Sequence, residues 1–149
     1  MSPGRPDEAV IRSHLVALDE ALQTLRKHQG RAAGILKTDR EEFWVVQHGL
    51  QLCAQNVLDV ATHIVASSGY DVADYGAAID RLADLAILPR EFAERFRAVA
   101  GFRNVIVHGY LGVDVSIVHR ILNAGLDDFV AFARHVNAYS TASVPKVST

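Results

Sequence analysis

Apolar residues recur at spacings of three and four along most of this chain, and that period predicts helices rather than strands. The first predicted helix has about five turns, counting 3.6 residues per turn. Asp7 and Glu8 lie in its first turn, where the helix dipole favours negative charge. It ends near Lys27 and is closed by Gly30. Its apolar face consists of Ile11, Leu15, Leu18, Leu22 and Leu25.

The longest predicted helix starts at Thr38 or Asp39, each of which has a glutamate three residues later, in the spacing of a capping box. Its apolar period continues to residues 67–69, which gives about 27 residues and a length of roughly 40 Å. The opposite face carries a ladder of polar residues at intervals of four. This ladder is either a solvated face or the lining of a cleft with Asp59 near its end; its members are Gln47, Gln51, Gln55 and Asp59.

Shorter helices follow. Asp74 is the predicted N-cap of the third helix, and Pro89 occupies the first position of the fourth, which we expect to continue without interruption into residues 101–110. After Gly112 the period resumes at Asp114 or Ser116. A last short helix carries Phe129, Phe132 and Val136.

The whole chain, residues 1–149, is predicted to be a single all-α domain. The expected architecture is an up-and-down bundle of four main helices plus one or two short C-terminal helices. Residues 1–6 and 140–149 are rich in proline, glycine, serine or threonine, and we expect them to be flexible.

Composition narrows the class of protein. Half of the 149 residues are hydrophobic, and the formal charge of −2 argues against a surface that is basic throughout. Cys53, the only cysteine, falls in an apolar helical pattern and is interpreted as a core residue in a reducing compartment. No membrane span or secretory leader is evident, so we expect a cytoplasmic protein. No spacing of zinc ligands is found, and no metal or other cofactor is predicted.

One stretch, residues 101–110 (GFRNVIVHGY), places four polar side chains in an apolar run. Arg103 falls on the core line of its predicted helix, where an unpaired charge costs several kcal/mol. Tyr110 lies seven residues further on the same face, whereas Asn104 and His108 share the neighbouring face. A purely structural explanation is that Arg103 pairs with Asp59 or another buried acid, while His108 and Tyr110 cap the helix end.

The spacing of Arg103 and His108 suggests a site shared between subunits. On a helix with 100° of rotation per residue, two side chains five residues apart point about 140° away from each other. They are also separated by a rise of about 7.5 Å along the axis. Either the helix bends near Gly109, or the side chains converge with copies from a second subunit. A two-fold dimer across this face would bring together two arginines and two histidines.

The pattern Arg103-x4-His108-x-Tyr110 resembles the motif of the HepT-like toxins, within the HEPN superfamily. The order of helices is also similar, with Asp59 on the long second helix and Asp114 starting the helix after the motif. The resemblance covers roughly residues 8–138. It implies a HEPN-like helical bundle that acts as a homodimeric endoribonuclease, the toxin of a type VII-like toxin–antitoxin pair.

The same resemblance implies roles for individual residues. Arg103 and His108 would be catalytic with Asn104 supporting them, and Asp59 is a possible supporting acid. The partner would be a minimal nucleotidyltransferase antitoxin that silences the toxin by transferring AMP to Tyr110. RNA supplies its own 2′-hydroxyl nucleophile, so the residues fit cleavage without a metal.

Two alternatives remain open from the sequence. In the first, a non-catalytic HEPN dimer serves as a binding subunit for a nucleotidyltransferase. In the second, the chain is a structural helical dimer with a buried arginine network.

Overall fold

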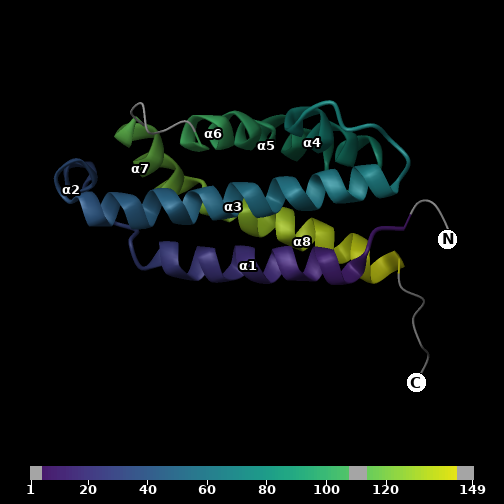
Figure 1. Cartoon of the computed structure of the whole chain (residues 1–149), viewed down its shortest axis with the longest axis horizontal. Helices are drawn as coiled ribbons and strands as arrows, with labels where there is room; N and C mark the ends of the chain where they lie inside the picture. Colours follow the sequence, from purple (N-terminus) through teal and green to yellow (C-terminus); the bar gives the residue numbers. More distant parts are fainter. Residues whose placement is uncertain (1–4, 108–113, 144–149) are drawn as a thin grey trace, which may run out of the picture.

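The computed structural model describes residues 5–107 and 114–143, and within these ranges all the regular secondary structure is α-helical. The longest helix, α3 (Arg40–Ser67), packs against α1 (Glu8–Arg26) on one side and against α4 (Tyr75–Asp84) and α6 (Ala98–Val107) on another. Figure 1 shows α1 and α3 running antiparallel, with α4, α5 (Arg90–Phe96) and α6 lined up along the other side of α3. The all-α fold class is therefore confirmed.

Three further helices complete the bundle. α7 (Val115–Ala124) contacts α2 (Ala33–Thr38), and both lie at one end of the molecule (Figure 1). α8 (Leu126–Ser143) packs against α1, α3 and α7. The central position of α3 explains why both of its flanks are apolar.

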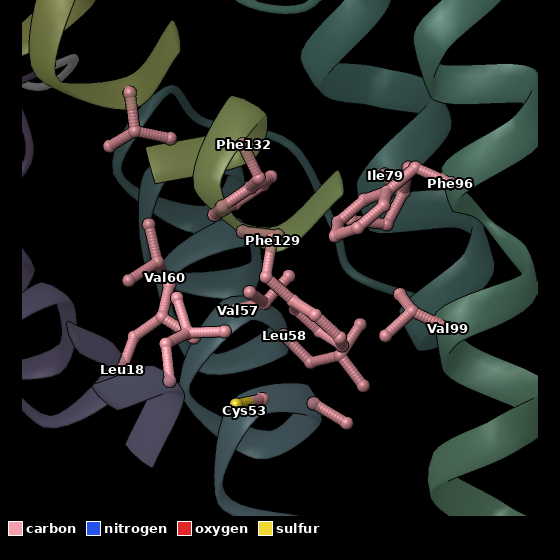
Figure 2. Close-up of a cluster of buried hydrophobic side chains, with 14 of the residues drawn as sticks. Leu18, Cys53, Val57, Leu58, Val60, Ile79, Phe96, Val99, Phe129 and Phe132 are labelled. Atoms are coloured by element: carbon pink, nitrogen blue, oxygen red, sulfur yellow. The ribbon is translucent and has the colours of Figure 1, made fainter. Parts of the chain in front are cut away.

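The core is formed where α3 meets its neighbours. Figure 2 shows side chains from α1, α4, α5, α6 and α8 converging on this helix. Leu18, Leu58, Ile79 and Phe132 are all at most 1% exposed. Cys53 is fully buried among them, and burial raises the pKa of its thiol to about 12. A thiol in such an environment is inert at neutral pH, which confirms its interpretation as a core residue.

Caps fix the helix boundaries that the sequence predicts. The Asp39 carboxylate accepts a hydrogen bond from the Glu42 amide at 3.1 Å, so Asp39 rather than Thr38 is the N-cap of α3. Asp74 caps α4 by accepting from the Ala77 amide at 2.7 Å. Asp114 accepts from both the amide and the hydroxyl of Ser116, and these two bonds lower the pKa of its carboxyl. These three predicted helix starts are confirmed.

Other expectations were wrong in detail. The fourth helix is not continuous, because α5 ends at Phe96 and α6 starts at Ala98 after a turn at Arg97. Pro89 is the N-cap of α5 rather than its first helical residue. The six-residue helix α2 was not predicted at all.

The last helix is long rather than short. α8 has 18 residues and reaches Ser143, so residues 140–143, expected to be part of a flexible tail, are helical. Ser and Thr at the end of a helix lower its propensity without preventing it from continuing. The rest of that tail, residues 144–149, lies outside the described residues. At the other expected flexible end, residues 1–4 also lie outside them, and only Arg5 and Pro6 are described.

Candidate functional site

The site is organised around Arg103 on α6, which faces the polar ladder of α3. Its Nε donates a hydrogen bond to Oε1 of Gln55 at 3.1 Å. Gln55 in turn donates from Nε2 to Oδ1 of Asp59 at 2.8 Å. Asp59 therefore reaches Arg103 through an intervening amide, and the two form no ion pair among the described residues.

Two more side chains hold the guanidinium group of Arg103. Its Nη1 donates a long hydrogen bond to Oδ1 of Asn104 at 3.4 Å. Its Cζ lies 5.1 Å from the ring centroid of Tyr75, the first residue of α4, in cation–π geometry. Each of these groups is neutral. Arg103 is thus fixed on three sides, and no carboxylate among the described residues forms an ion pair with it.

The exposure of these side chains suits a site at the protein surface. Arg103, Gln55, Asp59 and Tyr75 are partly buried, while Asn104 is exposed. Arg103 lies next to the core rather than within it, since Val99, one turn earlier on α6, is only 7% exposed. A partly buried guanidinium keeps some N–H groups available and loses less hydration than a fully buried one.

The sequence prediction placed five residues at this site, and the structure brings three of them together. Arg103 and Asn104 are in contact, and Asp59 joins them through Gln55. The other two, His108 and Tyr110, lie outside the described residues. The structural explanation of a direct Arg103–Asp59 ion pair is replaced by the chain Asp59–Gln55–Arg103.

Two residues at the site were not predicted. Gln55 was noted only as a member of the polar ladder, although its position four residues before Asp59 already places the two on one face. Tyr75 lies 28 positions before Arg103, and nothing in the local sequence indicates that they meet. Only the packing of α4 against α6 brings the ring under the guanidinium.

Among residues 5–107 and 114–143, no three histidine, cysteine, aspartate or glutamate side chains come close enough to bind a metal ion together.

No helix in the part of the chain that the structure describes has the length and apolar character needed to cross a membrane.

The chain matches known proteins in sequence and in fold. A family model described as "Ribonuclease HepT-like" matches residues 18–136, a range that includes all five predicted site residues. The protein named "tRNA nuclease HepT" from Aphanizomenon flos-aquae is 25% identical over 135 residues, which are 89% of this chain and 91% of that protein.

Solved structures show the same fold at lower identity. The tri-AMPylated Shewanella oneidensis HEPN toxin, in complex with its MNT antitoxin, is 21% identical, with a TM-score of 0.77 over 87% of this chain and 97% of the toxin. YutE from Bacillus subtilis, a cytosolic protein of unknown function, is 17% identical, with a TM-score of 0.81 over 96% of each chain. At these identities the likeness shows the fold alone. The family match covers most of the chain, and the protein belongs to the ribonuclease HepT-like family.

Proposed function

We propose that this chain is a metal-independent endoribonuclease, the toxin of a toxin–antitoxin pair. The observation that carries the proposal is the environment of Arg103. Its guanidinium is held by Gln55, Asn104 and the Tyr75 ring, none of which neutralises it. A positioned arginine with an uncancelled charge is suited to bind phosphate oxygens and to stabilise the charge that develops during cleavage.

In the proposed reaction, the 2′-oxygen of RNA attacks the adjacent phosphorus and the bond from phosphorus to the 5′-oxygen breaks. The products are a 2′,3′-cyclic phosphate and a free 5′-hydroxyl. One proton leaves the 2′-hydroxyl and one reaches the departing 5′-oxygen, and His108 is the residue we assign to proton transfer, because the imidazole pKa lies near neutral pH. Arg103 stabilises the phosphorane, and Asn104 supports Arg103.

We propose that the enzyme acts as a homodimer. Each chain supplies one motif histidine, whereas the reaction requires a base and an acid, so two subunits supply both. Asp59 contributes indirectly in this scheme, by orienting Gln55 against Arg103.

Regulation by a minimal nucleotidyltransferase is proposed on the same basis. The tyrosyl oxygen of Tyr110 would attack the α-phosphorus of ATP and release pyrophosphate, leaving AMP on the side chain. A phosphodiester close to Arg103 would place negative charge where the substrate phosphate binds, and so block the site. The AMPylated state of the similar S. oneidensis toxin supports this proposal.

The substrate class is proposed from the named relative. Because the A. flos-aquae protein is a tRNA nuclease, bulk tRNA is the first substrate to test. Expression without the partner is expected to slow growth and to cut tRNA. Arg103→Ala and His108→Ala are each expected to weaken both effects strongly while the protein stays folded.

Three results would count against parts of this proposal. A folded wild-type chain that neither slows growth nor cuts RNA would point to the alternative, a non-catalytic binding subunit for a nucleotidyltransferase. Full activity in His108→Ala would remove that residue from proton transfer. After co-expression with the partner, AMP found by mass spectrometry at a residue other than Tyr110 would remove Tyr110 from regulation.

A further inference from the structure

A groove of about 620 Å³ opens beside Arg103, between α6 and the start of α4. It shares two residues with the Arg103 site, since Asn104 and Tyr75 both line the groove and both contact the guanidinium. A molecule whose phosphate is bound by Arg103 would therefore have the groove as its immediate neighbour. Such a volume falls within the range of roughly 300 to 1,000 Å³ that is typical of small-molecule sites.

The groove is open because several of its walls have almost no side chain. Ala73, Gly76, Ala100 and Gly101 all line it. A Cβ atom at Gly101 would meet no atom within 4 Å, so this residue faces open space. A Cβ atom at Gly76 would approach Nη2 of Arg97 to 3.3 Å and Oδ1 of Asp74 to 3.4 Å, so glycine there lets these two polar groups lie close together.

The polar groups of the groove favour a neutral ligand over a second phosphate. Arg97 is already paired with Asp80 at 2.9 Å, and the Asp74 carboxylate accepts a hydrogen bond from the Ala77 amide. The Asp74 carboxylate would repel an anion. Asn104 adds an amide that both donates and accepts hydrogen bonds. A flat group with donors and acceptors on its edge, such as a nucleobase, matches this lining.

We propose that the groove binds the base of a nucleotide that flanks the scissile phosphate. The inference rests on the proposed ribonuclease function and adds a subsite to it. Unstacked bases of single-stranded RNA are recognised by hydrogen bonds to their edges and by stacking on aromatic rings or guanidinium planes. Recognition here restricts cleavage to RNA in which that base is free to leave its stack.

The test combines a change in the groove with a change in the RNA. The wild-type cut in bulk tRNA is mapped first, and an RNA oligonucleotide spanning it is made in three forms: intact, and lacking the base on either side of the cut. Gly101→Leu fills the groove from α6. Gly34→Leu is the matched control, because Gly34 is also an exposed helical glycine whose added Cβ would meet nothing within 4 Å.

Removing one of the two bases is expected to lower kcat/KM of the wild type and of Gly34→Leu by about tenfold or more. For Gly101→Leu, kcat/KM on intact RNA is expected to fall by a similar factor. It is expected to fall no further on the RNA that lacks that base. If Gly101→Leu fails to fold, as judged by circular dichroism, Ala73→Leu fills the groove from the opposite wall and takes its place.

The subsite is overturned if the filled groove cuts intact RNA as fast as Gly34→Leu does. It is also overturned if the filled groove lowers cleavage of intact and abasic RNA by the same factor, because the loss would then not involve the base. A wild-type chain that cuts no RNA overturns the proposed function itself. If the wild type instead cuts both abasic RNAs as fast as intact RNA, only the subsite is overturned.

Discussion

Two arginines of this protein are held in opposite ways. Nη1 of Arg31 lies 2.6 Å from Oε1 of Glu42, and Nδ1 of His28 lies 2.7 Å from the same oxygen. Glu42 is the one buried charged residue among the described positions, at 9% exposed. Arg103, in contrast, is held by two neutral amides and an aromatic ring. One arginine is neutralised and the other is only positioned.

We interpret this difference in partners as a difference in what each arginine contributes to the protein. The Glu42 cluster ties the segment after α1 to the first turn of α3, and its charges satisfy one another, which leaves little for a ligand. At Arg103 the protein instead keeps a positive charge in a fixed orientation with N–H groups left to donate. We interpret the first arrangement as a contribution to stability, and the phosphate binding proposed above would account for the second.

The largest expected effect comes from removing each arginine in turn. If the proposed function holds, Arg103→Ala is expected to lower tRNA cleavage about 100-fold or more, as the loss of one charge-stabilising group does in known active sites. It should leave the thermal midpoint nearly unchanged, because its partners are neutral and partly solvated. Arg31→Ala should do the reverse and lose about 1 kcal/mol of unfolding free energy, reduced by its solvent exposure. If the two variants lost cleavage to the same extent and also lost stability to the same extent, the proposed difference between Arg103 and Arg31 would be wrong.

The next effect concerns the buried acid. Glu42→Ala leaves His28 and Arg31 without their common partner and is expected to lower the free energy of unfolding by about 2 kcal/mol. Glu41→Ala is the matched control, because Glu41 lies in the same first turn of α3 but is exposed. Urea titrations of both variants measure the difference. An equal loss in the two variants would show that the helix dipole, rather than the cluster, is responsible.

A smaller effect is expected at Tyr75. The ring lies under the Arg103 guanidinium, and contacts of this kind contribute roughly 0.5–1 kcal/mol. Tyr75→Leu is therefore expected to lower kcat/KM for RNA about threefold, while Tyr75→Phe, which keeps the ring, stays near the wild-type value. If Tyr75→Phe loses as much as Tyr75→Leu, the hydroxyl rather than the ring face is the contributing group.

The long helices could be predicted from the sequence, because the period and the capping residues agree. Asp39 and Asp74 were found as caps for this reason. The break at Arg97 could not be found, since the apolar spacing from Phe96 to Val99 continues across it as if the helix were unbroken. The short helix α2 buries only Leu36, which is too few positions for a period to be visible.

The contacts around Arg103 could be predicted only in part. The charge of Arg103 on an apolar line indicated that it needs a partner, and Asp59 was a reasonable candidate by position. The sequence could not show that Gln55 stands between them, because an amide and a carboxylate on the same helix face are equally within reach of an arginine from α6. The contact with Tyr75 depends on tertiary packing alone.

The central claim, that neutral partners leave the charge of Arg103 available, is tested most directly by supplying it with a carboxylate. Gln55→Glu, combined with Asp59→Asn so that two acids do not meet, gives Arg103 the kind of partner that Arg31 has. The control is Gln51→Glu, again combined with Asp59→Asn. Residue 51 lies one turn earlier on the same polar ladder, so this variant adds the same charge away from the hydrogen bond of Arg103 Nε.

The measurement is kcat/KM for tRNA cleavage as a function of salt concentration. Gln55→Glu is expected to lower kcat/KM about tenfold or more, with a weaker dependence on salt because one phosphate contact is lost. Gln51→Glu is expected to stay within about twofold of Asp59→Asn alone, because residue 51 is only partly buried and a charge there stays partly solvated. Equal rates and equal salt slopes in the two variants would contradict the claim.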